Sequence, residues 1–251
     1  VDCIIALPID SKAIVSSIES AHKADIPFVC NMRSEDPDAE EKSDAFCGQD
    51  TVAQAYDAAV ALNEVLEEDG ITIEDIKILH IVGDLKDENA VNRAEGFTKA
   101  AEEFGWNIVS EIPTEWNPDL ALNGATNALS ANSDINVVLI ASDFLWPSVK
   151  SALISQDKLF ERGEEGHVYI VSQDLFPEAI QEIKDKIMDT DGIFDFEKFS
   201  KAAVVAADKL VKGEEIEDRI ILVAGDIANL KNIDELAEIY WGRDYEDVEL
   251  D

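Results

Sequence analysis

Residues 1–30 constrain the fold most, because they indicate a strand, a helix and a second strand in direct succession. An apolar run at 1–7 predicts a buried strand. Asp10 or Ser11 can then cap a helix, since apolar residues recur after them at helical spacing. Residues 24–30 lead into another buried strand. Two strands joined through a helix form a βαβ unit, which requires a parallel sheet.

The same alternation continues along the rest of the chain. Helices are expected at 51–68, 89–104, 119–130, 144–155, 177–188, 196–212 and 233–240. Strands are expected at 76–82, 106–112, 135–141, 167–172 and 220–223, and an acidic tail at 244–251. This pattern predicts an α/β fold with parallel sheets covered by helices on both faces.

The net charge of -35 limits the partners that the chain can have. Nucleic acids are excluded, because binding their phosphates needs clustered lysine and arginine. Anionic lipid is disfavoured for the same reason. No apolar run approaches the roughly 20 residues that span a bilayer, so no membrane span is expected. The simplest interpretation of the charge is a solubilising surface.

The three cysteines, Cys3, Cys30 and Cys47, have no zinc-binding spacing. Cys30 and Cys47 fall near the ends of consecutive strands, so a disulfide between them is left open. The chain contains no calcium loop, no glycine-rich phosphate loop and no nucleophile elbow. We therefore expect no metal, no cofactor and no catalytic site. The three histidines are more simply structural or surface residues than catalytic ones.

Polar residues at the carboxyl ends of the predicted strands are the candidate ligand-binding groups, because ligands of open α/β sheets bind there. They include Arg33, Ser142–Asp143 and the segment Ser172–Asp174. Arg33 is a lone cation among acids and can fork onto hydroxyls or a carboxylate. Pairing with a nearby Asp or Glu is the equally simple alternative.

Two aromatic residues complete the candidates. Trp116 lies in a polar loop after a strand, where an exposed ring would offer a stacking platform for a ligand. Its alternative role is to anchor that loop to the core. Phe194 is a weaker candidate, because such residues are more often part of a core.

Taken together, several runs of the chain resemble the type I periplasmic binding proteins, and within them the ribose-binding-protein-like sugar receptors. No single run is specific, but their order and spacing are. The runs are VDCIIALPIDS (1–11), ADIPFV (24–29), NAVNRAEGF (89–97), ASD (141–143) and ADKLVKG (207–213).

The resemblance implies two Rossmann-like lobes joined by three crossings and closing on one small ligand. Lobe one would comprise 1–49 and 195–224, and lobe two 50–194 and 225–251. The resemblance also implies that an N-terminal βαβα segment of lobe one precedes Val1 in the full protein. Lobe one would then be incomplete, with one flank of its first strand uncovered.

The resemblance implies that some site residues of the family are present in this chain and that others are replaced. Arg33 matches the ligand-binding arginine of the family, Trp116 its stacking aromatic residue, and Ser142–Asp143 its Asn-Asp pair. Val91 stands where ribose receptors have a second arginine, and Phe194 where they have a glutamine. These departures indicate another sugar or a less polar small molecule.

One further departure concerns the acid that binds sugar hydroxyls in the family. Ser172 stands in its place, and Asp174 can take over that role. Both residues therefore belong to the predicted ligand-binding set.

The resemblance implies an extracytoplasmic solute-binding protein of an ABC transporter, in the periplasm or as a cell-surface lipoprotein. It would bind a monosaccharide-like ligand by hinge closure and deliver it to a membrane permease. Two alternatives stay open: a ligand-sensing domain of the same fold in a repressor or receptor, and an α/β enzyme.

Overall fold

The computed structural model describes residues 1–240 of the chain, so the predicted acidic tail lies outside the described residues. The chain divides into two compact units. Unit 1 contains residues 1–50, 86–89 and 195–224. Unit 2 contains 51–85, 90–194 and the chain from 225 onward. Each unit is therefore assembled from segments that are far apart in the sequence.

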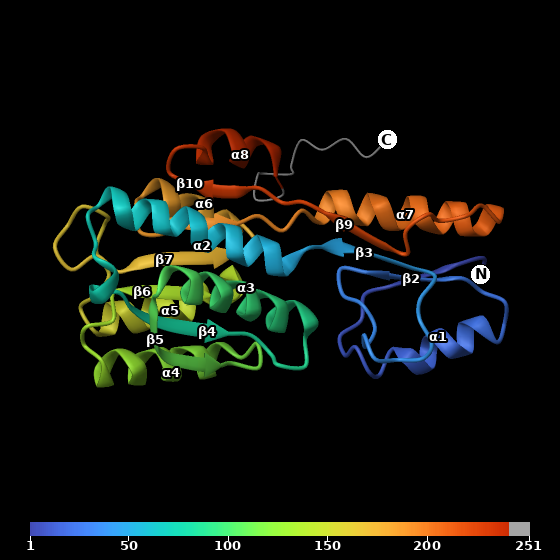
Figure 1. The fold of residues 1–251 in the computed structure, drawn as a ribbon, viewed down its shortest axis with the longest axis horizontal. Coiled ribbons are helices and arrows are strands. Elements are labelled where there is room, and N and C mark those ends of the chain that lie inside the picture. The colour runs from blue at the N-terminus through green and yellow to red at the C-terminus, as the bar shows by residue number, and fades with distance from the viewer. Residues whose placement is uncertain (241–251) are drawn as a thin grey trace. The chain divides into compact units, whose positions relative to one another are not determined.

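Unit 1 is a parallel four-stranded sheet with a helix on each face (Figure 1). The strand order is β1-β2-β3-β9. Side chains alternate between the two faces, as the pleat requires: Val29 and Cys47 pack against α7, whereas Phe28 and Cys30 pack against α1. The elements are β1 (Ile4–Ala6), α1 (Val15–His22), β2 (Phe28–Asn31), β3 (Ala45–Gln49), α7 (Phe196–Lys212) and β9 (Ile220–Val223).

Strand β1 is an edge strand of this sheet. Among the described strands it pairs only with β2, with Ile4 opposite Phe28. Ile5 and Leu7 are exposed, although a strand in the interior of a parallel sheet is usually covered on both faces. Asp10 accepts hydrogen bonds at Oδ1 from the backbone N–H groups of residues 12 and 13, so it caps the turn that leads into α1.

Unit 2 is built on a six-stranded sheet of order β10-β8-β7-β6-β4-β5. All neighbours are parallel except β10, which runs antiparallel to β8. The strands are β4 (Lys77–Val82), β5 (Asn107–Pro113), β6 (Val137–Ile140), β7 (Tyr169–Gln173), β8 (Thr190–Gly192) and β10 (Ile227–Asn229).

Helices cover both faces of this sheet. One face carries Leu79, Val138 and Ile170 and packs against α4, α5, α6 and α8. The other carries Ile78 and Val171 and packs against α2 and α3 (Figure 1). The helices are α2 (Thr51–Glu68), α3 (Glu88–Phe104), α4 (Pro118–Ala131), α5 (Trp146–Ser155), α6 (Pro177–Lys184) and α8 (Ile233–Ile239), with 3-10 turns η1 (Ile73–Asp75) and η2 (Asp143–Leu145). The predicted fold class, α/β with parallel sheets, is confirmed.

Three details of the sequence prediction were wrong. Strands β8 and β10 were not predicted, because neither Thr190–Gly192 nor Ile227–Asn229 contains an apolar run. Helix α5 begins two residues later than expected, after η2. Helix α6 ends at Lys184 because Lys186 adopts a left-handed φ of 58°, which a continuing helix cannot accommodate.

The structure also decides the disulfide that the sequence left open. Cys30 and Cys47 lie on the neighbouring strands β2 and β3, as predicted. Their registers differ by one residue, since Cys30 pairs with Phe46 and Asn31 pairs with Cys47. The two side chains therefore point to opposite faces of the sheet, and all three cysteines are free.

Candidate ligand-binding site

The parallel strands of unit 2 end along one edge of the sheet, and polar residues gather there. Ser142 and Asp143 follow β6, and Asp174 follows β7. Gly83 follows the neighbouring strand β4, and β8 ends at Gly192. The structure thus brings the predicted residues of β6 and β7 together at the edge where open α/β sheets bind ligands.

Asp174 is the centre of a buried polar cluster at this edge. Its Oδ1 accepts a hydrogen bond from Arg93 Nη2 at 2.6 Å, and its Oδ2 accepts one from the Ser142 hydroxyl. Arg93 Nη1 also donates to the carbonyl oxygen of Ala141 at 2.7 Å. The side chains of Arg93 and Asp174 are 4% and 8% exposed. Because water is largely excluded there, the electrostatic attraction between the two side chains is strong and holds both in position.

Phe194 supports this cluster from inside unit 2. The guanidinium carbon of Arg93 lies 5.0 Å from the centroid of the Phe194 ring, within cation–π range. Phe194 is fully buried. The structure therefore places this predicted ligand-binding residue beneath Arg93, where it supports a charged group.

Arg93 belongs to this cluster but was not among the residues predicted from the sequence. The expected arginine position, Val91, is occupied by an apolar side chain that is 43% exposed on α3. Arg93 lies two residues further along the same helix, and its charge reaches Asp174. The sequence contained one indication of this residue, because the matched run 89–97 has an arginine near the expected position. Arg93 Nε is buried and has no hydrogen-bond partner among the described residues.

A second pair of acids lies behind the cluster. Asp143 and Asp191 are both buried, and their carboxyl groups lie within reach of each other. Burial raises the pKa of each carboxyl, and the charge of Asp174 raises both further. The charge of Asp143 also raises the pKa of Asp191, whereas the contact with Asp191 lowers that of Asp143. The buried Ser172 hydroxyl beside Asp143 and the backbone N–H of Phe176 oppose part of the increase at Asp143. Asp191 lies in the unpredicted strand β8 and therefore was not a candidate.

Trp116 packs against the backbone of Gly83. A methyl group at Gly83 would lie 2.4 Å from ring atoms Cζ2 and Cη2 of Trp116, so a larger residue there would require the ring to move. The ring is half-buried against the apolar cluster of unit 2. This contact is the anchoring role considered as the alternative for Trp116. Stacking of its remaining surface on a ligand stays a prediction.

Arg33 lies in unit 1 and is paired within that unit. Its Nε and Nη2 atoms donate to the two carboxylate oxygens of Asp87 at 2.8 and 2.7 Å. This bidentate pairing is the alternative that the sequence left open for Arg33. Ser34 next to it donates to Glu88. Asp87, which precedes α3, and Glu88, its first residue, thus hold the segment that follows β2 in place.

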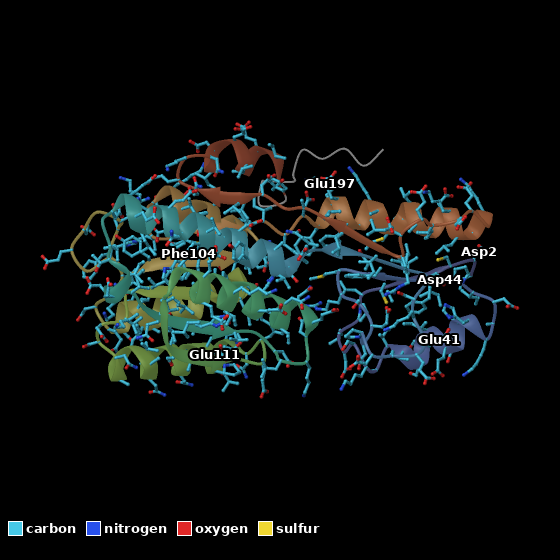
Figure 2. All side chains as sticks on the ribbon, in the orientation of Figure 1. Asp2, Glu41, Asp44, Phe104, Glu111 and Glu197 are labelled. Carbon is cyan, nitrogen blue, oxygen red and sulfur yellow. The ribbon has the colours of Figure 1, made fainter. Side chains whose placement is uncertain are left out.

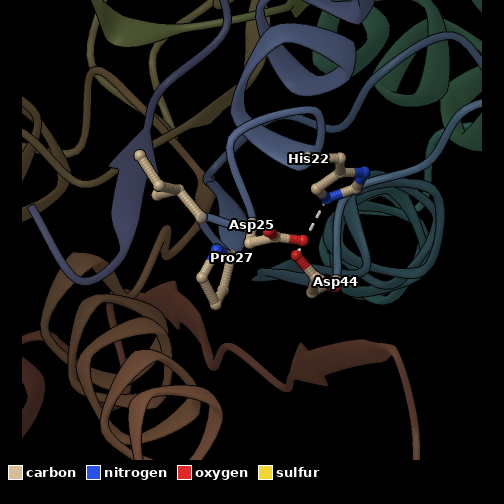
Figure 3. Close-up of a pocket in the computed structure, with 5 residues that line it drawn as sticks. His22, Asp25, Pro27 and Asp44 are labelled. Carbon is tan, nitrogen blue, oxygen red and sulfur yellow. Dashed lines mark hydrogen bonds and ion pairs between the residues drawn. The ribbon is translucent and has the colours of Figure 1, made fainter.

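A surface pocket of unit 1 is lined by His22, Asp25, Ile26, Pro27 and Asp44 (Figure 3). His22 Nε2 lies 3.0 Å from Asp44 Oδ2, and its Nδ1 contacts Glu41. Pro27 and Asp44 directly precede strands β2 and β3. The pocket therefore lies at the amino ends of the strands, and we assign His22 a structural role there.

The other two histidines are also bound within the fold. His80 Nδ1 lies 3.1 Å from Oε2 of Glu111, which Figure 2 labels. His167 Nε2 lies 3.2 Å from Oδ2 of Asp189. Within residues 1–240 no group of three or more His, Cys, Asp or Glu side chains is arranged to hold a metal ion. None of the described helices is long and apolar enough to cross a membrane.

Comparison with known proteins agrees with this architecture. The model of the family described as "Periplasmic binding protein domain" matches residues 1–215. The ribose import binding protein RbsB of Haemophilus influenzae is 24% identical over 147 residues, which cover 59% of this chain and 48% of that protein. RbsB of Salmonella typhimurium is 24% identical over 214 residues, covering 84% and 66%. The chain thus spans less than two thirds of either relative.

Solved structures give the same result. A periplasmic solute-binding protein of an ABC transporter from Actinobacillus succinogenes, with bound D-allose, has a TM-score of 0.82 at 25% identity, covering 94% of this chain and 80% of its own. A solute-binding protein from Bacillus halodurans with bound myo-inositol has a TM-score of 0.79 at 21% identity, covering 96% and 78%. These proteins and the RbsB relatives are named for binding or import, and none of them is named as an enzyme. By fold and by family match, the chain belongs to the periplasmic binding protein domain family and resembles its ribose-binding members.

Proposed function

We propose that this chain is the ligand-binding part of an extracytoplasmic solute-binding protein that serves an ABC transporter, and that its ligand is a monosaccharide or a similar cyclic polyol. The observation that carries the proposal is the buried cluster of Arg93, Asp174 and Ser142 at the carboxyl ends of β6 and β7. This cluster combines donors and acceptors in a place where a small ligand is expected.

The chemistry of the cluster suits hydroxyl groups. A sugar hydroxyl can donate to a carboxylate such as Asp174 and accept from a guanidinium such as Arg93. Arg93 Nε is a buried donor without a partner among the described residues, and an accepting hydroxyl would satisfy it. Hydrogen bonds to charged groups each contribute about 1.5–3 kcal/mol, so a few of them suffice to hold a small polyol.

The charge and the relatives support the same class of ligand. A chain of net charge -35 repels anionic solutes at long range, whereas a neutral sugar is unaffected. The similar proteins named above are ribose import proteins or hold D-allose or myo-inositol. The closing of two lobes on the ligand, delivery to a membrane permease and an extracytoplasmic location belong to this proposal as implications of the family resemblance.

Titration calorimetry of the chain with D-ribose, D-allose and myo-inositol tests the proposal. We expect at least one of them to bind, and Asp174→Asn to weaken that binding by roughly 10–150-fold, the loss of one charged hydrogen bond. Asp185→Asn is the control, because it removes one negative charge from an exposed position on unit 2. Absence of binding by all three ligands at millimolar concentration, or wild-type affinity in Asp174→Asn, would contradict the proposal.

A further inference from the structure

We propose that Asp191 is a positioning residue for the ligand-binding site: it shares one proton with Asp143, and the protonated pair fixes the turn that carries Asp174. The geometry of the pair is independent of the proposed function. The role of the turn in binding rests on that function, because it assumes that Asp174 contacts the ligand.

The shared proton follows from the hydrogen bonds of the two side chains. Asp191 Oδ1 accepts from the backbone N–H of Leu175 at 3.0 Å, and Asp143 Oδ2 accepts from that of Phe176 at 2.8 Å. The other oxygens, Asp191 Oδ2 and Asp143 Oδ1, are buried and have no hydrogen-bond donor among the described residues, and the Ser172 hydroxyl beside Asp143 has no partner either. The two carboxyl groups lie within reach of each other, so each has an unpartnered buried oxygen that the other could bond through a proton. A bond between two carboxyl groups requires one proton, which satisfies both oxygens at once.

The surroundings favour keeping that proton. The charged group that acts on both acids is Asp174, which is negative, and the cation of the cluster, Arg93, is paired with Asp174. The elements packed on β8 carry no lysine, arginine or histidine, since α2, β7 and β10 contain none. Helix α2 instead presents Gln54, which donates to the carbonyl of Gly192, and β10 places Ala228 opposite Asp191. Two adjacent buried charges without a cation are strongly disfavoured.

The pair holds a strained turn in place. Asp174 and Leu175 have φ values of 107° and 54°, in the left-handed region that non-glycine residues rarely adopt. Three hydrogen bonds keep the turn there: those from Leu175 and Phe176 to the two acids, and that from the Asp174 N–H to the carbonyl of Gly192 at 2.8 Å. The same turn presents the Asp174 carboxylate to Arg93 and Ser142. Loss of the proton would leave two like charges under the turn and displace Asp174.

A carboxyl titration of the full chain without ligand tests the pair directly. In a protein labelled with ¹³C at aspartate Cγ, we expect one aspartate carboxyl to keep its proton well above pH 5, where ordinary aspartates are ionised. Asp191→Asn should abolish this signal, because the amide replaces the shared proton with an N–H that donates to Asp143. Ionisation of every aspartate carboxyl in the ordinary range near pH 4 would overturn the proposal.

The second test measures affinity for D-allose, or for whichever of the three polyols binds, between pH 5 and pH 9. We expect wild-type affinity to fall by about tenfold as the pair loses its proton. A tenfold change in affinity corresponds to a difference of about one pKa unit for the pair between the free and the ligand-bound protein. Asp191→Asn should bind with an affinity that changes less than twofold, whereas Asp185→Asn should follow the wild type. Equal pH profiles for wild type and Asp191→Asn would overturn the positioning role. Failure of all polyols to bind would contradict the proposed function but leave the carboxyl titration intact as the test of the pair.

Discussion

Arg93 and Asp174 form a buried ion pair, with Nη2 2.6 Å from Oδ1, although 81 residues separate them in the chain. The pair joins helix α3 to the turn after β7, so it ties two sequence-distant parts of unit 2 to one point. Both the stability of unit 2 and the geometry of its polar cluster should depend on this contact.

Removing the cation from this pair should destabilise the protein strongly. In Arg93→Met, Asp174 is left buried without its counter-charge, which typically costs about 3–5 kcal/mol of unfolding free energy. Urea unfolding followed by circular dichroism measures the change. Lys99→Met is the matched control, since the Lys99–Glu95 pair is exposed and worth at most about 1 kcal/mol. Similar losses in the two variants would contradict the importance of the buried pair.

Substitution of Gly83 should displace Trp116 without altering the tryptophan itself. The added methyl group of Gly83→Ala would lie 2.4 Å from the ring, so the ring must move, at a cost of about 1–3 kcal/mol for overpacking. We expect a shift in the Trp116 fluorescence, identified by comparison with Trp116→Phe. If the ring also stacks on the ligand, Trp116→Ala should weaken polyol binding by about 1–3 kcal/mol. Unchanged fluorescence in Gly83→Ala would show that the contact is loose.

His22 should make the stability of the chain depend on pH. Burial lowers the pKa of His22, but hydrogen bonds to Glu41 and Asp44 outweigh it, and the net effect is an increase. The protonated ring therefore stabilises the folded state fully below the unfolded pKa of about 6.5, and this contribution is lost as pH rises through the higher folded pKa. We expect His22→Gln to lower the urea midpoint clearly at pH 5.5 and only slightly at pH 8.5. Equal effects at both pH values would contradict the assignment.

The buried thiols should be unreactive in the folded protein. Burial raises the pKa of Cys30 to about 12 and that of Cys47 to about 11, so almost no thiolate forms at pH 8. Cys3 is only half-buried. With a thiol reagent at pH 8, we expect Cys3 to react first and the other two only after unfolding in guanidinium chloride. Rapid reaction of all three in the folded state would mean that the sheet of unit 1 opens readily.

Helices and strands with a regular repeat of apolar residues could be predicted from the sequence. Short strands that form only because neighbouring strands pair with them could not. Helices α2 and α7 were predicted with the bounds that the structure shows, because their apolar residues repeat over many turns and clear signals end them. Strand β8 has the sequence Thr-Asp-Gly and exists because β7 and β10 flank it. Its strand character comes from tertiary context, which a local pattern does not record.

The residues of the candidate site show the same difference between those that a local sequence pattern reveals and those that it does not. Ser142, Asp143 and Asp174 could be found because they follow apolar strands, and strand ends are visible in the sequence. Arg93 and Asp191 could not, because their importance lies in which side chains they meet. Arg93 meets an acid 81 residues away, and Asp191 meets Asp143 from a strand that has no local signal.

The discontinuous make-up of unit 1 has a consequence for how the chain is made. Strand β3 ends at Gln49, but its neighbour β9 and the covering helix α7 come only from residues 196–223. At roughly 5–20 residues per second, a ribosome needs roughly 10–30 s to add them after β3. During that time Val29, Ala45 and Cys47 lack the helix that covers them in the finished protein. The nascent chain thus exposes an apolar sheet face while unit 2 is still being synthesised, and chaperones that hold unfolded chains would meet unit 1 first.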